Sequence, residues 1–274
     1  MKVAFQGERG AYSEMAAVQY FPNAESVPMK SFQDVFESVE SGKIDFAVVP
    51  IENSIEGSIN EAYDLLLQTD IIVSGEIYQR IKHCLIVNKN TSSLKAVYSH
   101  PQALAQCRSY LQKMNLHPVA TYDTAGAVRI IKEKRIMDAA AIASKKAAKL
   151  YEMVILEEGI EDRKNNFTRF LVLSKKETNS TGHDGTSIIF SVPHLPGALF
   201  NILEEFAKRK INLTTIESRP TKETPWEYNF YVDFEGHVCD PIVREALSSI
   251  KKKTSFLKIL GSYRRAEFNL CNDN

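Results

Sequence analysis

Strand-like and helix-like hydrophobic patterns alternate through the first two-thirds of the chain. Short apolar runs predict strands at Lys2–Gln6, Asp45–Pro50, Ile71–Ile77, His83–Val87, Ala96–Tyr98, Met137–Ile142 and Arg169–Leu173. Between them, apolar residues at helical spacing predict helices at Tyr12–Tyr20, Phe32–Glu40, Ile59–Gln68, Gln102–Lys113, Thr124–Lys132 and Lys145–Leu150. This alternation is typical of parallel or mixed sheets that are covered by helices.

The pattern changes after a polar stretch in the last third. Thr178–Gly185 is rich in Gly, Ser, Thr and Asn and has almost no apolar side chain, which predicts a linker. Strands follow at Thr186–Val192, Leu213–Ser218, Tyr228–Phe234 and near Phe256–Tyr263, with helices beginning near Gly197 and at Asp240–Pro241. The order βαββαβ predicts a ferredoxin-like unit.

Composition adds that the chain is long enough for more than one domain. Its 274 residues are 44% hydrophobic and 25% charged, which allows a sizeable core. Lysine plus arginine equals aspartate plus glutamate at 34 each, so nucleic acid and membrane are not expected partners and the ligand should be small. No stretch approaches about 18 consecutive apolar residues, and MKVAFQG enters a strand directly, which predicts a cytoplasmic protein.

The cysteines and histidines give no sign of a metal site. Cys84, Cys107, Cys239 and Cys271 are far apart and form no C-x-x-C pair. The six histidines show no H-x-x-x-H or similar spacing. Zinc binding and a disulfide framework are therefore not expected.

The segment Val48–Ile59 places a carboxylate, an amide and a hydroxyl directly behind a predicted strand. Pro50 is expected to stop further strand pairing, and Glu52, Asn53 and Ser54 follow it. Open α/β sheets bind ligands at such strand ends. Taken alone, the segment is a binding loop or an ordinary solvated turn before a helix.

Further polar loops follow other predicted strands. Ser99 and Gln102 could donate hydrogen bonds to a ligand oxygen, whereas His100 between them suits a structural hydrogen bond better than a general base. The loop Gly7–Gly10 precedes a helix whose free N–H groups could hold an anion, although a plain tight turn is an equal interpretation.

The loop Asn165–Phe170 is the densest in polar groups. It contains two amides, a hydroxyl at Thr168 and a guanidinium at Arg169. This set would suit a dicarboxylate, with Thr168 as a proton donor and Arg169 for a charge-assisted pair. The alternative is a β-turn that carries a surface arginine.

Together these loops resemble the prephenate dehydratase family. The matching blocks are FQGERGAYSEMAA (Phe5–Ala17), PIENSIEGSI (Pro50–Ile59), SHPQALAQC (Ser99–Cys107), AAIASKKAAKLY (Ala140–Tyr151) and NNFTRFLVL (Asn165–Leu173), the last with the Thr-Arg-Phe signature. The tail resembles the family's regulatory ACT domain, because Gly197–Leu199 and Glu217–Pro220 look like its phenylalanine-binding motifs. Phe200 and Asp123 depart from the family pattern, where a smaller aliphatic residue and a serine are usual.

The resemblance implies a two-lobed α/β catalytic region, similar to periplasmic binding proteins, followed by an ACT domain. It suggests a catalytic region at 1–176, with lobe one at about 1–77 plus 160–176 and lobe two at about 78–159. The ACT domain would occupy 186–274. The active site would lie in the cleft between the lobes.

The implied reaction converts prephenate to phenylpyruvate in phenylalanine biosynthesis and requires no metal or organic cofactor. The implied catalytic residues are Thr168, Asn53, Gln102, Glu52 and Ser99. The implied substrate-binding residues are Ser54, Arg169, Asn166, Phe170, Gly10 and Ala11. Arg169 is expected either to bind the side-chain carboxylate or to lock the Thr168 loop from behind.

The implied regulation is inhibition by phenylalanine bound to a homodimer or homotetramer that pairs through the tails. The effector residues would be Gly197, Ala198, Leu199, Asn212, Glu217, Ser218, Arg219 and Pro220. Two other functions stay open: an arogenate dehydratase, which acts on the transaminated substrate, and an amino-acid-sensing ACT protein without chemistry. A periplasmic solute-binding protein would share the lobes, but no signal peptide is evident.

Overall fold

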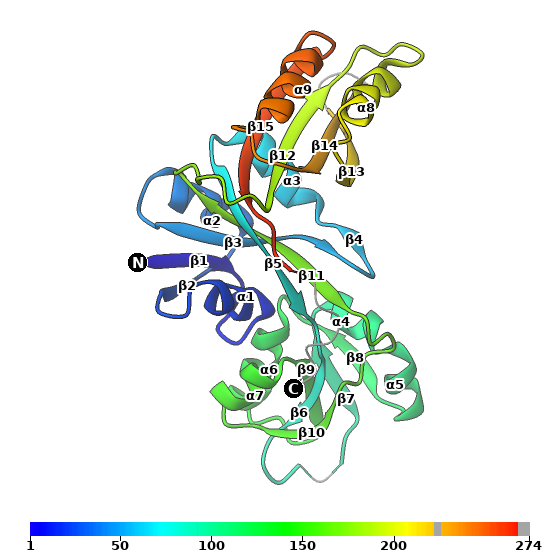
Figure 1. Cartoon of the computed structure of the whole chain (residues 1–274). Coiled ribbons are helices and arrows are strands. Elements are labelled where there is room, and N and C mark those ends of the chain that lie inside the picture. Colours follow the sequence, from blue (N-terminus) through cyan, green and yellow to red (C-terminus); the bar gives the residue numbers. More distant parts are fainter. Residues whose placement is uncertain (92, 222–225, 268–274) are drawn as a thin grey trace.

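The computed structural model describes residues 1–91, 93–221 and 226–267. The described chain folds into lobe one, lobe two and a C-terminal tail domain, and each of these parts contains one β-sheet (Figure 1). Lobe one lies between lobe two and the C-terminal tail domain. Cys271 lies outside the described residues. No helix in the described ranges has the length and apolar character needed to cross a membrane.

Lobe one is a mixed sheet flanked by helices. Its strands have the order β2 (Glu25–Met29), β1 (Lys2–Gln6), β3 (Phe46–Asn53), β11 (Phe167–Ser174) and β5 (Ile72–Arg80), and β4 (Gly57–Ser58) pairs with β3. Helices α2 (Phe32–Glu40) and α3 (Asn60–Gln68) pack on one face, and α1 (Tyr12–Tyr20) packs on the other. The returning strand β11 runs antiparallel to both β3 and β5. It therefore lies inside the sheet, with a neighbour on each side.

Helix α2 shows how local sequence determines these elements. The Ser31 hydroxyl accepts a hydrogen bond from the Asp34 amide at 3.1 Å, and the Asp34 carboxylate accepts one from the Ser31 amide at 3.1 Å. This capping box satisfies two amides that a helix start leaves free. Val35, Phe36 and Val39 then form the buried face that packs on the sheet.

Lobe two is a second mixed sheet with helices on both faces. Its strands have the order β10 (Val154–Glu158), β6 (Cys84–Val87), β9 (Ala139–Ala143), β7 (Ala96–Ser99) and β8 (His117–Ala120). Helices α6 (Thr124–Glu133) and α7 (Lys145–Leu150) cover one face, and α4 (Pro101–Gln106) and α5 (Arg108–Lys113) cover the other. The strand β9 has the sequence AAAIA and is buried throughout, so its small side chains let both helix layers pack closely.

The chain leaves lobe one after β5 and returns to it before β11. The outgoing and returning segments are hydrogen-bonded to each other: the amides of Gly159 and Ile160 donate to the His83 carbonyl at 2.8 and 3.2 Å. The Ile81 amide donates to the Asn166 carbonyl at 2.8 Å. The lobes are thus joined by paired backbone segments that pass beside the cleft.

The tail domain has the ferredoxin-like arrangement that the sequence predicts. Its strands have the order β13 (Leu213–Pro220), β14 (Tyr228–Glu235), β12 (Asp184–Ser191) and β15 (Phe256–Arg264), and every neighbouring pair is antiparallel. Helices α8 (Ala198–Lys208) and α9 (Pro241–Lys251) cover one face of the sheet. The predicted fold class, two α/β lobes followed by a βαββαβ domain, is confirmed.

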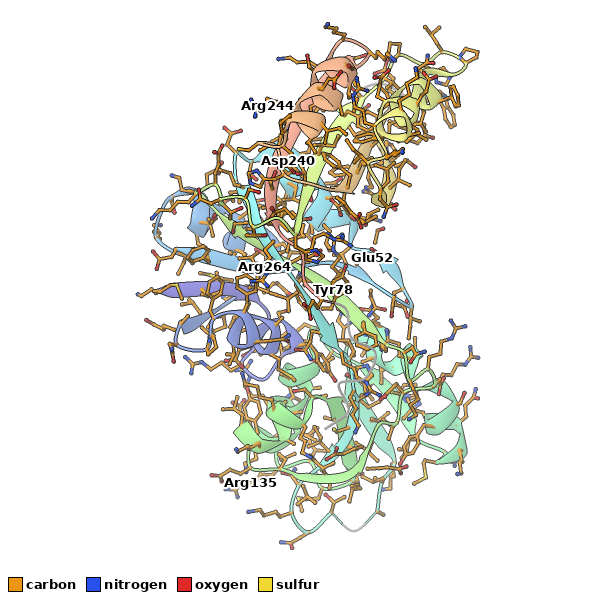
Figure 2. All side chains as sticks on the ribbon, viewed as in Figure 1. Glu52, Tyr78, Arg135, Asp240, Arg244 and Arg264 are labelled. Atoms are coloured by element: carbon orange, nitrogen blue, oxygen red, sulfur yellow. The ribbon has the colours of Figure 1, made fainter. Side chains whose placement is uncertain are left out.

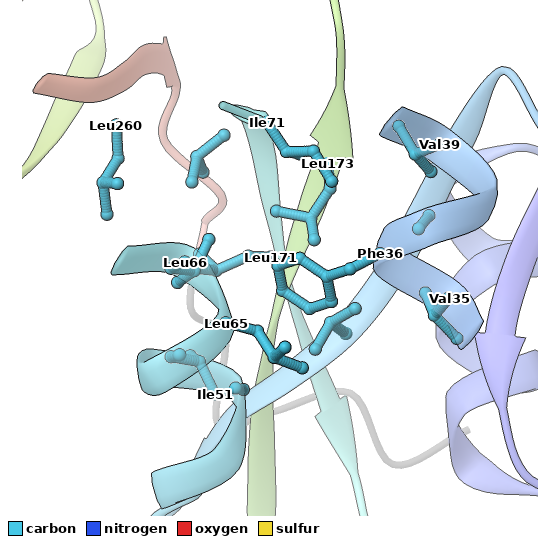
Figure 3. Packing of buried hydrophobic residues seen from close by; sticks show 14 of the residues in the cluster. Val35, Phe36, Val39, Ile51, Leu65, Leu66, Ile71, Leu171, Leu173 and Leu260 are labelled. Atoms are coloured by element: carbon cyan, nitrogen blue, oxygen red, sulfur yellow. The ribbon is translucent and has the colours of Figure 1, made fainter. Parts of the chain in front are cut away.

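The other face of the tail sheet packs directly on lobe one. Leu260 and Tyr263 of β15 belong to the same buried cluster as Leu66 of α3 (Figure 3). The rings of Tyr231 and Tyr63 meet edge to face with centroids 4.7 Å apart, and the Tyr231 hydroxyl donates to the Tyr63 carbonyl at 2.9 Å. A continuous hydrophobic core therefore holds the tail domain against lobe one.

Helices are predicted more closely than edge strands. Helices α1 and α2 have the expected bounds, whereas the predicted helix Gln102–Lys113 is broken at Cys107, whose backbone (φ −112, ψ 18) is not helical. The pattern misses β2, β8 and β10, which lie at sheet edges. Pro28 and Pro118 obscure the first two, because proline argues against a strand unless the strand is an edge. The pattern also ends β3 too early, because Pro50 pairs with Phe170 and the pairing continues to Asn53.

The predicted linker Thr178–Gly185 is a structured turn that runs into β12. The Asp184 carboxylate accepts hydrogen bonds from the Thr181 and Gly182 amides at 2.8 and 3.0 Å and from the Ser180 hydroxyl at 3.1 Å. The polar side chains of this stretch therefore form hydrogen bonds within the turn itself. Asp184, which accepts these bonds, is also the first residue of β12 and so determines where the tail sheet begins.

Gly261→Ala should weaken the contact between β15 and lobe one. A Cβ atom at Gly261 would lie 2.2 Å from the Val73 carbonyl oxygen, and φ there is +149. We expect the free energy of unfolding to fall by more than about 2 kcal/mol in urea denaturation, because overpacking and backbone strain add.

Gly182→Ala is the matched control for this substitution. Gly182 also has a positive φ, +83, but nothing lies within 4 Å of its Cβ position. It should lose only about 1 kcal/mol, the cost of the strained backbone alone. Equal losses for the two variants would contradict the importance of the close approach between β15 and β5.

Candidate active site

A cavity of about 150 Å³ lies between the two lobes and collects polar side chains from both. Asn53 at the end of β3 and Thr168 in β11 come from lobe one, while His100 and Gln102 at the start of α4 come from lobe two. Phe170 contributes to the apolar wall. Loops that are far apart in the sequence thus meet at one small site.

The Asn53 side chain has a defined orientation. Its Oδ1 accepts hydrogen bonds from the Ile55 and Glu56 amides at 3.0 and 3.1 Å. Its Nδ2 must therefore face the other way, where it donates to Thr168 Oγ1 at 3.0 Å and to Asn166 Oδ1 at 2.8 Å. Asn53 is only 4% exposed, so water does not compete for these bonds.

This orientation determines what the Thr168 hydroxyl can do. A hydroxyl has a single proton, and the Thr168 oxygen already accepts a hydrogen bond from Asn53. Its own proton is consequently available to a molecule bound in the cavity. In the part of the chain that the structure describes, no histidine or carboxylate is hydrogen-bonded to this hydroxyl. Thr168 is thus a neutral hydrogen-bond donor.

Arg169 lies on the opposite side of the sheet from Thr168, because successive strand residues alternate between faces. Its guanidinium binds Glu76 Oε2 at 2.8 Å, Asp233 Oδ2 at 2.5 Å and the Tyr263 hydroxyl at 3.1 Å. These partners belong to β5, β14 and β15. Arg169 therefore connects lobe one to the tail domain, which agrees with the expected lock from behind and not with a carboxylate site in the cavity.

Glu52 is also directed away from the cavity. Across the β3–β11 pair, Glu52 is opposite Arg169, and Asn53 is opposite Thr168. Directly opposed residues share a face of the sheet. Figure 2 shows Glu52 with Tyr78 near the boundary with the tail domain. The structure does not bring Glu52 together with Thr168.

The predicted serines bind backbone groups. Ser99 is fully buried, and its Oγ donates to the Ile142 carbonyl at 2.7 Å, which joins β7 to β9. Ser54 Oγ donates to the Asn165 carbonyl at 3.0 Å and accepts from the Phe167 amide at 2.9 Å. Both hydroxyls therefore position the cavity walls instead of facing the cavity.

Gly10 and Ala11 lie where the two lobes touch. A Cβ atom at Gly10, where φ is +92, would lie 2.8 Å from Ala147 Cα, and the Ser144 hydroxyl donates to the Gly10 carbonyl at 2.6 Å. Ala11 is buried at the start of α1, and the next residue, Tyr12, lines the cavity. Gly10 thus permits the close approach of α7 that orients this part of α1.

Gln106 and His83 also belong to the site, although neither is among the predicted residues. Gln106 Oε1 accepts a hydrogen bond from Asn166 Nδ2 at 2.8 Å and lies 3.0 Å from His83 Nε2. Gln106 follows Gln102 by four residues, so its position on the same helix face was a usable signal. His83 has no comparable signal, because the pattern places it at the start of the predicted strand His83–Val87, outside any polar loop.

A larger cavity of about 710 Å³ adjoins the site at Tyr12 and is predominantly basic. It is lined by Arg80, Lys82, Lys145, Lys164, Glu158 and Glu161, among other residues. Glu158 binds Lys145 at 2.7 Å and Lys82 at 3.7 Å. The positive balance favours anions. Among the described residues, no group of three His, Cys, Asp or Glu side chains could hold a metal ion.

The first predicted effector motif borders a cavity of about 170 Å³ in the tail domain. Gly197 precedes α8, and Ala198 and Leu199 in its first turn line the cavity. Trp226 and Tyr228 contribute aromatic rings to the same cavity. The apolar lining and the adjacent helix start suit a small molecule with an apolar side chain and a carboxylate.

The second predicted effector motif lies on the edge strand β13. Glu217 and Arg219 share the face toward lobe one, where Arg219 Nη2 is 3.3 Å from Asp64 Oδ1. Ser218 and Pro220 point to the other side and are exposed. Within one chain, the described residues of this motif do not line the cavity at α8.

Asn212 and the two departures from the family pattern also lie outside that cavity. Asn212 Nδ2 donates to Glu235 Oε1 at 3.2 Å. Phe200 is 65% exposed on α8. Asp123 caps α6 by accepting a hydrogen bond from the Gly126 amide at 2.8 Å, the function that a serine would also serve.

Comparison with known sequences identifies both parts of the chain. Residues 3–178 match the family model described as prephenate dehydratase, and residues 186–252 match that of the ACT domain. The chain is 46% identical over 278 residues to "Arogenate dehydratase/prephenate dehydratase 2, chloroplastic" of Arabidopsis thaliana, covering 96% of this chain and 72% of that protein.

Solved structures agree over nearly the full length. The prephenate dehydratase of Arthrobacter aurescens in complex with L-Phe superposes with a TM-score of 0.89 at 31% identity, covering 97% of this chain and 90% of that one. A chain described as "GqqA- a novel type of quorum quenching acylases" has a TM-score of 0.89 at 31% identity, covering 98% and 99%.

Asn53→Asp tests the orientation of this side chain. The aspartate can still accept from the Ile55 and Glu56 amides, but it cannot donate to Thr168 or Asn166. We expect urea denaturation to show a loss of about 1 to 3 kcal/mol, because buried acceptors lose their donor.

Asn165→Asp is the matched control, because Asn165 is exposed in the adjacent loop. It should change the free energy of unfolding by less than about 0.5 kcal/mol. If Asn53→Asp were equally silent, the donor role of Asn53 Nδ2 would be wrong.

Proposed function

Because the chain belongs to the prephenate dehydratase family, we propose that it converts prephenate to phenylpyruvate in the cavity between the lobes, with Thr168 as the donor to the departing hydroxyl. The observation that carries this proposal is the hydrogen bond from Asn53 to Thr168 Oγ1 at 3.0 Å, which leaves the Thr168 proton for the substrate. Gln102, which lines the same cavity, would orient the ring hydroxyl.

The chemistry requires little from the protein. The ring loses its carboxylate as CO₂ and its hydroxyl as water, and formation of the aromatic ring drives the reaction. Hydroxide leaves poorly, so a group must protonate it or stabilise its charge in the transition state. A threonine hydroxyl is a weak acid, and Thr168 would therefore act as a preorganised hydrogen-bond donor in a site that excludes water.

The charges around the site support this assignment. Among the described residues that line the cavity there is no lysine or arginine. A carboxylate that departs as CO₂ must not be held by a salt bridge that favours its ground state. In the adjoining basic cavity, Arg80 and Lys82 would bind the side-chain carboxylate, which is one of the two roles that the sequence left open for Arg169.

The positive charge of the adjoining cavity also favours prephenate over arogenate as the substrate. Arogenate has an ammonium group where prephenate has a ketone, and the positive balance of the adjoining cavity disfavours an additional cation. A comparison of kcat/KM for the two substrates on purified protein tests this preference. A higher value for arogenate would make the chain an arogenate dehydratase.

An acyl-transfer reaction, suggested by the similar chain described as an acylase, finds less support in this cavity. A threonine nucleophile needs a neighbouring base. Thr168 Oγ1 is hydrogen-bonded to the Asn53 amide, which cannot accept its proton.

Thr168→Ala should lower kcat by at least about 10²-fold with a smaller change in KM, because its hydroxyl acts mainly in the transition state. Thr168→Ser should retain part of the activity. Steady-state assays of prephenate turnover measure both. Thr91→Ala, a change to a hydroxyl on a distant loop, is the control and should match wild type. Wild-type kcat in Thr168→Ala would place the donor elsewhere.

We further infer that residues 1–176 are the catalytic region and that 186–274 form a regulatory domain that senses phenylalanine. The cavity beside Ala198 and Leu199 would accept the phenyl ring among Tyr228 and Phe230. The amides at the start of α8 would favour its carboxylate. The complex with L-Phe reported for the similar structure from Arthrobacter aurescens supports this ligand.

We infer that the sensing form is at least a dimer. Leu195, Phe200, Ile216 and Trp226 expose 68%, 65%, 48% and 76% of their surface on the tail domain. Leu195 and Trp226 line the same cavity, and exposed apolar side chains that lie together are typical of an interface. Since the motif Glu217–Pro220 does not reach the cavity of its own chain, the edge strand β13 of a second copy would complete the site.

Ala198→Leu should reduce phenylalanine affinity at least about tenfold by filling the cavity, with basal kcat unchanged. Isothermal calorimetry and inhibition assays on the intact chain measure both quantities. Ala207→Leu on the exposed side of the same helix is the matched control. Unchanged phenylalanine binding in Ala198→Leu would exclude this cavity as the effector site.

A further inference from the structure

We propose that His83 is a positioning residue of the reaction, which acts through Gln106, Asn166 and Asn53 to hold the Thr168 hydroxyl in its donating orientation. Successive hydrogen bonds connect His83 Nε2 to Gln106, Gln106 to Asn166, Asn166 to Asn53 and Asn53 to Thr168, at 3.0, 2.8, 2.8 and 3.0 Å. The inference rests on the proposed role of Thr168.

His83 occupies a rigid place beside the cleft. It is 2% exposed and lies in the segment that leaves lobe one. Its amide donates to Glu161 Oε2 at 2.9 Å, and its carbonyl accepts from the Gly159 and Ile160 amides. The backbone of His83 is thus tied to the returning segment, and its ring has a fixed direction.

The direction of each donor in the network follows from the fixed end at Asn53. Since Asn53 Oδ1 is occupied by backbone amides, Asn53 Nδ2 donates to Asn166 Oδ1. Asn166 must then present its Nδ2 to Gln106 Oε1. That oxygen can only accept, so the His83 nitrogen facing it has to be an N–H. The network therefore requires the Nε2–H tautomer of His83.

The burial of His83 determines the charge of its ring, and the Gln106 contact determines its tautomer. Burial lowers the pKa of His83, which keeps the ring neutral near pH 7. Nδ1 is then unprotonated. The Tyr12 hydroxyl, whose oxygen lies 3.2 Å from Nδ1, donates its proton to the Lys82 carbonyl at 2.7 Å, so this contact does not select the tautomer. Burial raises the pKa of Tyr12 well above its ordinary value, so that hydroxyl keeps its proton.

Without the His83 donor, Gln106 Oε1 would lose one of the two donors that hold its orientation and would keep only Asn166 Nδ2. Rotation by half a turn would direct Gln106 Nε2 at Asn166 Nδ2, and two amide donors cannot bond to each other. Gln106 belongs to lobe two and Asn166 to the segment returning to lobe one, so the contact that is lost spans the cleft. Asn166 and Asn53 would then hold Thr168 less firmly.

The test compares two amide replacements of His83 that differ in where they place a donor. In His83→Gln the Nε2 donor coincides with that of histidine, whereas in His83→Asn the amide reaches only the position of Nδ1. We expect His83→Asn to lower kcat about tenfold with KM changed less than twofold, and His83→Gln to restore at least half of wild-type kcat. Equal kcat in the two variants would overturn the proposal.

A double-mutant cycle separates positioning of Thr168 from a general structural effect. In the Thr168→Ala background, His83→Asn should lower kcat less than twofold, because the hydroxyl it positions is gone. A tenfold loss in both backgrounds would show that His83 acts elsewhere. Wild-type kcat in Thr168→Ala would contradict the proposed role of Thr168 as the donor. Wild-type kcat in His83→Asn, together with a low kcat in Thr168→Ala, would leave that role intact and contradict only the role of His83.

Two controls complete the test. His117→Asn, at an exposed histidine of lobe two, should leave kcat unchanged. The ¹⁵N shifts of the His83 ring in the intact enzyme should report Nε2–H with an unprotonated Nδ1, whether or not a variant folds well. The Nδ1–H tautomer would contradict the proposal.

Discussion

The structure depends on the strand β11, because its alternation presents Thr168 to the cleft and Arg169 to the tail domain. Arg169 is almost fully buried, and Glu76 and Asp233 neutralise it. Removing either carboxylate would leave a buried charge without its partner, which costs far more than an exposed ion pair contributes. The docking of the tail domain is therefore specified by charge as well as by the hydrophobic core around Leu260, and any shift of the tail sheet acts directly on the strand that carries Thr168.

The cleft is organised by amides instead of charges. Asn53 and Asn166 have both ends of their side chains defined by hydrogen bonds, so their dipoles do not reorient when a substrate binds. Preorganised dipoles stabilise developing charge without the reorganisation that water would need. They also avoid the strong ground-state attraction that a cation would exert on the carboxylate that is lost. Charged side chains are concentrated in the adjoining basic cavity, where they would bind the part of the substrate that does not react.

The sequence predicts the fold well and the site in part, for a physical reason. Helices with clear periodicity and caps, such as Phe32–Glu40, are encoded locally, and the polar loops at strand ends identify Asn53 and Thr168. Glu52 is assigned to the wrong side, and Arg169 is left open between two roles, because each is adjacent in sequence to a cavity residue. The period of two in a strand excludes both from the face of Asn53 and Thr168. Gln106 shares a helix face with Gln102, which is a local signal, whereas His83 joins the site only through tertiary contacts that no local pattern encodes.

The contacts of the tail domain explain how an effector bound far from the cleft would change the structure of the cleft. The cavity at the start of α8 borders β14 at Tyr228 and Phe230, and the same strand carries Asp233, the partner of Arg169. Strand β13 pairs with β14 and carries Arg219, which contacts Asp64 of α3. A ligand that draws β13 of one copy toward α8 of another would therefore act on two contacts with lobe one at once. These are the ion pair of Asp233 with Arg169 and that of Arg219 with Asp64. Buried ion pairs and packed cores change between discrete arrangements and do not deform continuously. A displacement of β13 and β14 would therefore favour a second position of β11. The proposed inhibition then requires no contact between phenylalanine and the catalytic lobes.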